Sequence, residues 1–178
     1  MAKPASITSA TRPVELRSTA AVKVALAEDS FRHEALFYNG EAPFDGSLPA
    51  PPAEHEQLLF TRLGLGAVRN LVSLRASEAG LGLDVGEELV LAINELATNS
   101  VQYGGGGGAL RIWREPDAFV CEVRDRGFIR DPLVGRLAPP VEQHGGRGLW
   151  LVNQLCDLVQ IRSAPSGTVV RVHTQVRR

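Results

Sequence analysis

Five consecutive glycines, Gly104–Gly108, follow a long amphipathic stretch and fix where a helix must end. Upstream of them, apolar residues recur at the i, i+3, i+4 and i+7 spacing of a buried helix face: Leu89, Ala92, Ile93 and Leu96. Asp84 is placed to cap the start of this helix, with Glu87 as its capping-box partner. Glycine enters the left-handed conformation without penalty, as a helix C-cap requires. The sequence therefore predicts a helix over 84–103.

The chain on both sides of this helix alternates between apolar segments and turn signals. The other predicted helices are Leu65–Ala79 and Arg147–Cys156, and the predicted strands are Gln57–Thr61, Ala109–Trp113, Ala118–Arg124, Leu158–Arg162 and Thr168–His173. Short turns (EPD and SAPSG) join four of these strands as two hairpins. Helices and hairpins in this order predict the α/β (α+β) class, a two-layer sandwich with helices on one face of a mixed, mostly antiparallel sheet.

A proline-rich run, PAPPAEHE, separates this regular part from a less regular N-terminal part. We expect residues 49–56 to be a linker, 57–178 to form the main domain, and 1–48 to be a partly disordered segment. Within that segment FRHEALFYNGEAPF resembles the beginning of a small sensory domain, and it is interpreted as a truncated remnant of one. We expect His33 to be a packing histidine rather than a phosphoacceptor.

Composition excludes several functional classes. The formal net charge is -1, with 19 basic and 20 acidic residues scattered along the chain, which argues against a direct nucleic-acid binder. No apolar run approaches the roughly 20 residues that cross a bilayer, and the N-terminus lacks the apolar core of a secretory signal. Cys121 and Cys156 are expected to be free buried thiols in a reducing compartment. We therefore expect a cytoplasmic protein with no membrane partner.

Two polar residues of the long helix are the first candidates for chemistry. Glu95 and Asn99 lie one turn apart, at the shoulder of the apolar face. The amide oxygen of Asn suits a hard cation such as Mg²⁺, and Glu can orient or deprotonate a neighbouring hydroxyl. Taken alone, the pair is more simply explained as a solvated helix edge.

Three glycine-containing segments follow. Asp125 ends a predicted strand two residues before Gly127, so its carboxylate could accept a hydrogen bond from the amino group of a base, although this pattern is commonly a turn. The segment GGRGL leads into a helix whose N–H groups would suit phosphates, and a flexible loop is the alternative. It matches neither a P-loop nor a dinucleotide fingerprint. Gly167 and Thr168 open the last strand.

Together the four segments resemble, in order, the four motifs of the GHKL, or Bergerat, ATP-binding domain. They read NELATNSVQYG, EVRDRG, GGRGLWLVNQLCD and GTVVRV, and the resemblance covers about 57–178. The short length and the single helix before the first motif make the chain most similar to the anti-sigma-factor serine/threonine kinases. The resemblance implies ATP and Mg²⁺ as cofactors, a sigma factor and a STAS-type anti-anti-sigma protein as partners, and a homodimer.

The resemblance also implies roles for individual residues. Glu95 would be the general base that activates a hydroxyl of the protein substrate. Asn99 would be the Mg²⁺ ligand, Asp125 would recognise adenine with support from Thr168, and Gly127 would line the base site. The phosphates would be held by the glycine-rich segment: Gly146, Arg147 and Gly148. Because phosphoryl transfer is mainly positioning and charge neutralisation, this small set could suffice.

Three positions depart from the family pattern. Ile129 stands where the DxGxG motif has its second glycine, Tyr103 where relatives often carry His, and His144 where some carry Arg. The departures at Ile129 and His144 leave open a second hypothesis, a nucleotide-responsive anti-sigma binding module without useful kinase activity. A third, the detached catalytic domain of a sensor histidine kinase, is less favoured because no long dimerisation helix with a phosphoacceptor His lies upstream.

Overall fold

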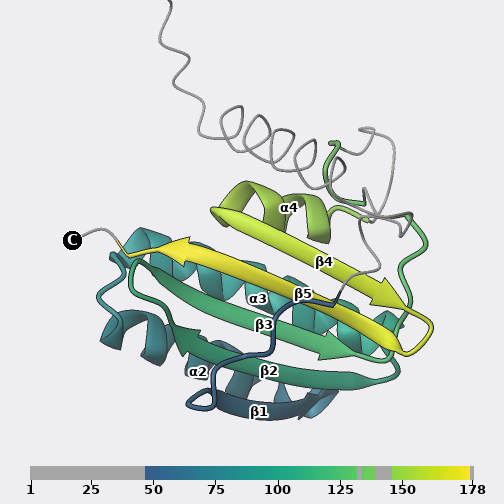
Figure 1. Ribbon diagram of the computed structural model, residues 1–178, viewed down its shortest axis with the longest axis horizontal. Helices are drawn as coiled ribbons and strands as arrows, with labels where there is room; N and C mark the ends of the chain where they lie inside the picture. Colours follow the sequence, from purple (N-terminus) through teal and green to yellow (C-terminus); the bar gives the residue numbers. More distant parts are fainter. Residues whose placement is uncertain (1–46, 132–133, 139–145, 177–178) are drawn as a thin grey trace, which may run out of the picture.

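The computed structural model describes residues 47–131, 134–138 and 146–176, which form a sheet layer and a helix layer (Figure 1). The helices are α2 (Leu65–Glu78), α3 (Leu83–Tyr103) and α4 (Gly148–Leu155), with a single 3-10 turn, η1 (Arg62–Gly64). The strands are β1 (Glu56–Thr61), β2 (Gly107–Arg114), β3 (Ala118–Asp125), β4 (Leu158–Ala164) and β5 (Gly167–Gln175). Each predicted helix and strand of 57–178 is present, with ends that differ by at most two residues.

The five strands form one sheet in the order β1-β2-β3-β5-β4. All four pairings in this sheet are antiparallel. The sheet is therefore fully antiparallel rather than mixed. In Figure 1, α2 and α3 lie behind the sheet, and α4 packs beside α3. The predicted α+β class and two-layer arrangement are confirmed.

Both ends of α3 differ in detail from the sequence prediction. The helix begins at Leu83 with Gly82 as its N-cap, and no side chain caps it. Asp84 was therefore wrongly predicted as the cap; it lies in the first turn, where a carboxylate interacts favourably with the positive end of the helix dipole. Gly104 is the C-cap, but its φ of −95° is not the left-handed conformation that was expected there. The left-handed conformation occurs in the next two residues, Gly105 and Gly106.

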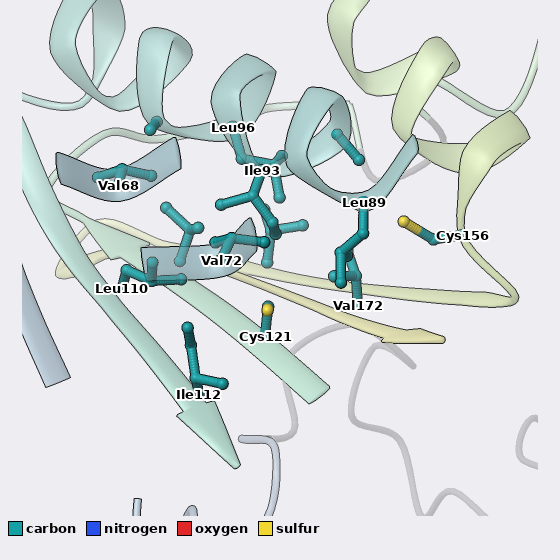
Figure 2. Packing of buried hydrophobic residues seen from close by; sticks show 14 of the residues in the cluster. Val68, Val72, Leu89, Ile93, Leu96, Leu110, Ile112, Cys121, Cys156 and Val172 are labelled. Carbon is teal, nitrogen blue, oxygen red and sulfur yellow. The ribbon is translucent and has the colours of Figure 1, made fainter. Parts of the chain in front are cut away.

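The core lies between the helices and the sheet (Figure 2). The predicted stripe of α3 is fully buried there, against side chains from β2, β3 and β5 such as Leu110, Cys121 and Val172. Cys121 and Cys156 are both buried and outside any disulfide, as expected. Burial raises the pKa of the Cys121 thiol well above its usual range, which keeps it protonated and makes it a packing residue.

The opposite face of the sheet carries a buried charge pair. Arg171 of β5 donates from Nη2 to Glu122 of β3 at 2.6 Å, and its guanidinium lies 4.9 Å from the ring centroid of Trp113. The same Nη2 donates to the carbonyl of Pro49 at 2.7 Å, which holds the start of the proline-rich run against the sheet. Figure 1 shows residues 47–55 crossing this face. The domain boundaries themselves stay a prediction.

Within the residues that the structure describes, no helix is both long and apolar enough to cross a membrane.

The exposed and buried leucines of α3 provide a test of the core. Leu89 is 1% exposed and Leu83 is 78% exposed. Leu89→Ala should lower the free energy of unfolding in urea by about 2–5 kcal/mol, because it removes packed atoms and leaves a cavity. Leu83→Ala is the matched control and should change it by less than about 0.5 kcal/mol. Equal effects of the two substitutions would contradict this description of the helix.

Candidate functional site

A cavity of about 650 Å³ opens between α3, the end of β3 and the start of α4. Its volume is in the range of small-molecule sites. All eight residues that the sequence analysis selected line it: Glu95, Asn99, Asp125, Gly127, Gly146, Arg147, Gly148 and Thr168. The other lining residues include Thr98, Gln102, Tyr103, Gly104, Phe128 and Ile129. Four separate motifs therefore converge on one concave surface.

The first group of residues lies where α4 begins beside α3. Glu95 and Asn99 are half-buried on α3, and Gly148 is the first residue of α4. A Cβ atom at Gly148 would lie 2.9 Å from Glu95 Oε2 and 3.2 Å from Asn99 Nδ2. The absence of a side chain at Gly148 therefore lets α4 begin beside both side chains as they stand. We call these three residues the α4-start cluster.

The backbone before α4 is shaped for an anion. Gly146 has φ +74°, a left-handed conformation that favours glycine. The N–H of Leu151 donates to the carbonyl of Arg147 at 2.8 Å, which is the first turn of the helix. The N–H groups ahead of Leu151 have no acceptor within the helix, and together with the helix dipole they favour negative charge.

The second group surrounds the carboxylate of Asp125, the last residue of β3. Its Oδ1 accepts the N–H of Gly127 at 2.8 Å, and its Oδ2 accepts the hydroxyl of Ser100 at 2.6 Å. Thr168 lies opposite Asp125 in the β3–β5 register, and its Oγ1 donates to the carbonyl of Gly127 at 2.9 Å. A carboxylate has about four acceptor positions, so Asp125 retains capacity for a ligand donor. We call Asp125, Gly127 and Thr168 the base cluster.

Gly104 allows α3 to approach this carboxylate. A Cβ atom at Gly104 would lie 2.5 Å from Asp125 Cγ and 2.7 Å from Oδ2. The carbonyl of Gly104 also accepts the N–H of Arg126 at 3.1 Å. The first of the five glycines is therefore required by contact with the site rather than by its φ angle.

Comparison with known proteins identifies the domain. The family model of the histidine kinase-like ATPase domain matches residues 40–174. The chain belongs to this family. The resemblance that the four motifs indicated is confirmed.

Two curated relatives of this ATPase domain are serine-protein kinases named RsbW. The chain is 32% identical over 132 residues to the protein from Bacillus velezensis, which covers 66% of this chain and 78% of the relative. It is 31% identical over 126 residues to that from Halalkalibacterium halodurans, covering 64% and 77%. A crystal structure of the RsbU and RsbW domains of a Mycobacterium tuberculosis protein matches with a TM-score of 0.54 at 18% identity. That match covers 71% of this chain and 34% of the longer one, and it supports the fold alone.

Two residues that hydrogen-bond to the cavity-lining Asp125 and Thr168 were not selected from the sequence. Ser100 is 1% exposed and lies seven residues after Ile93, on the core-facing side of α3. A polar residue at a buried position requires a partner, which is the signal that could have identified it. Ser163 was also missed, and it is hydrogen-bonded to Thr168. Its signal was the SAPSG turn, whose two-residue loop places Ser163 opposite Thr168.

Two of the three departures from the family pattern line the cavity. Ile129 and Tyr103 both border it, and Tyr103 is 76% exposed. His144 and His33 lie outside the described residues.

The close approach at Gly104 gives a prediction with a control in the same helix. Gly104→Ala should lower the free energy of unfolding by about 1–3 kcal/mol, because the new methyl group would displace the Asp125 side chain. Gly86→Ala should raise it by up to about 1 kcal/mol, because its Cβ would only contact Ala76 Cβ at 3.9 Å and alanine favours the helix. Urea titration measures both. A Gly104→Ala protein as stable as wild type would disprove the steric argument.

Proposed function

We propose that the chain binds ATP with Mg²⁺ in this cavity and transfers the γ-phosphoryl group to a serine or threonine of a partner protein. The observation that carries the proposal is the position of the two clusters on one cavity. The α4-start cluster offers a carboxylate, an amide oxygen and helix N–H groups, which suit a metal-bound triphosphate. The base cluster offers a carboxylate beside a glycine backbone, which suits a base amino group.

The residues present fit magnesium bound together with phosphates. Mg²⁺ commonly takes one or two protein oxygens and completes its shell with water and substrate phosphate. Asn99 would supply an amide oxygen, and the first turn of α4 would donate N–H groups to the phosphate oxygens. When bound, the ion would neutralise charge on the phosphates during transfer.

Glu95 is proposed as the general base. A Cβ atom at Gly148 would lie 2.9 Å from Glu95 Oε2, so the carboxylate borders the start of α4 and would stand beside the bound phosphates. The carboxylate would accept the proton of the substrate hydroxyl while the hydroxyl oxygen forms its bond to the γ-phosphorus. The bond from that phosphorus to the bridging oxygen breaks at the same time. The bridging oxygen keeps the electron pair of this bond and leaves as part of ADP.

The proposed partners follow from the family resemblance and from the kinase names of the two relatives. We propose that the protein is an anti-sigma factor that sequesters a sigma factor and is regulated by phosphorylating a STAS-type anti-anti-sigma protein in the cytoplasm. The buried thiols of Cys121 and Cys156, which form no disulfide, are compatible with that reducing compartment. A homodimer is also proposed, and sedimentation of the purified protein would test it.

The role of Asn99 can be tested by calorimetry. Asn99→Ala should weaken ATP binding at least about tenfold in the presence of Mg²⁺ and remove the dependence of the affinity on Mg²⁺. Asn94→Ala is the matched control in the same helix, because Asn94 bonds Arg69 at 3.0 Å and does not line the cavity. An unchanged, Mg²⁺-dependent affinity in Asn99→Ala would rule out this assignment.

The role of Glu95 requires a transfer assay with labelled ATP and candidate STAS proteins. Glu95→Ala should reduce the rate of label transfer to a partner serine or threonine by about 100-fold or more. Its ATP affinity should stay within about threefold of wild type, because the base acts on the incoming hydroxyl. Glu88→Ala, an exposed carboxylate two turns earlier on α3, should leave the rate unchanged.

The same assay distinguishes the second candidate function. That candidate is a nucleotide-binding anti-sigma module without kinase activity, and the observation that favours it is Ile129 on the cavity wall where the family motif has glycine. Micromolar ATP binding with no transfer to any STAS partner would favour the binding module. Transfer that persists in Glu95→Ala would instead exclude Glu95 as the base.

A further inference from the structure

A chain of hydroxyl groups runs behind the base cluster, from the β4–β5 hairpin to the loop after β3. The N–H of Ile129 donates to Ser163 Oγ at 2.7 Å. Ser163 Oγ lies 2.7 Å from Thr168 Oγ1, and Thr168 Oγ1 donates to the carbonyl of Gly127 at 2.9 Å. Thr168 and Ile129 line the cavity, whereas Ser163 does not.

The direction of each proton in this chain follows from the donors available. A carbonyl oxygen cannot donate, so the single hydroxyl proton of Thr168 is directed to Gly127. The contact between the two hydroxyls must then use the proton of Ser163, with Thr168 as acceptor. The oxygen of Ser163 is in turn occupied by the N–H of Ile129. Thr168 therefore has no proton left for a ligand, and its hydroxyl oxygen can act only as an acceptor.

A base cluster that offers only hydrogen-bond acceptors would distinguish adenine from guanine. Adenine carries an exocyclic amino group with two N–H donors, whereas guanine has a carbonyl oxygen at the equivalent position. The Asp125 carboxylate and the lone pair of Thr168 would both accept from the amino group and repel the carbonyl. If the hydroxyl of Thr168 were free to rotate, it could donate to guanine and weaken the discrimination.

We propose that Ser163 is a positioning residue for nucleotide specificity: by donating to Thr168 it fixes that hydroxyl as an acceptor and so favours adenine over guanine. This inference rests on the proposed function, since it requires a purine nucleotide in the cavity. Ser163 acts on nucleotide specificity through Thr168, without lining the cavity itself. Its hydroxyl also ties the hairpin to the loop that carries Gly127 and Ile129.

The test compares two variants of the same shape. Ser163→Val and Ser163→Thr differ only in that the second keeps a hydroxyl group. Calorimetric titration with ATP and with GTP should show that Ser163→Val lowers the ratio of the GTP to the ATP dissociation constant about fivefold to tenfold, the range of one neutral hydrogen bond. Ser163→Thr should retain the wild-type ratio. Loss of structure alone would weaken both nucleotides equally and leave the ratio unchanged.

Two further measurements show that the effect passes through Thr168. In a Thr168→Val background, Ser163→Val should cause no further change in the ratio, because the hydroxyl on which it acts is gone. Ser166→Ala, at the exposed turn of the same hairpin, should behave as wild type. If Ser163→Val does not fold, Ser163→Ala replaces it in the same comparison.

The outcomes separate the two proposals. If wild type binds ATP and both Ser163 variants keep its ratio, the role of Ser163 is overturned while the nucleotide site stands. If wild type binds neither nucleotide, the proposed function fails, and this inference fails with it.

Discussion

The carboxylate of Asp125 joins the last strand residue of β3 to the final turns of α3, and the geometry of the site depends on that junction. Ser100 donates to one oxygen at 2.6 Å and the N–H of Gly127 to the other at 2.8 Å. Because Ser100 directly follows Asn99 in α3, the junction also fixes where Asn99 and Glu95 stand relative to the sheet. A single half-buried carboxylate thus couples the base cluster to the α4-start cluster.

Glycines allow this junction and its neighbours to form. A Cβ atom at Gly104 would overlap the Asp125 side chain, one at Gly148 would lie 2.9 Å from Glu95 Oε2, and one at Gly167 would meet the backbone carbonyl of Asp125. Glycine loses more conformational entropy on folding than other residues, which lowers the stability of the folded state. At these positions that cost is offset because a larger residue would clash with the neighbouring segment. The cavity is bordered in part by glycine backbone, and at the start of α4 this leaves helix N–H groups available to a ligand.

The sequence predicted the local elements of this fold well because periodicity and turn residues are local signals. The stripe from Leu89 to Leu96 and the glycine stop after Tyr103 both appear as expected. The motif residues were also brought to one cavity, although their chemical roles stay predictions. Contacts between separate segments of the chain were harder to predict from the sequence. Ser100 and Ser163 act through partners 25 and 5 residues away, and those contacts depend on helix rotation and strand register. Asp84 was misassigned because the N-cap is Gly82, two residues before the position that the capping pattern suggested.

The departure at position 129 can be interpreted from the same hydrogen-bond chain. A glycine in the DxGxG motif leaves that part of the cavity wall without a side chain. Here Ile129 uses its backbone N–H to bond Ser163 at 2.7 Å, so the loop is held by the hairpin, and its side chain adds apolar surface to the cavity. An apolar wall suits the face of a planar base as well as open backbone does. The substitution therefore alters the surface that a base would contact while leaving Asp125, Glu95 and Asn99 in place.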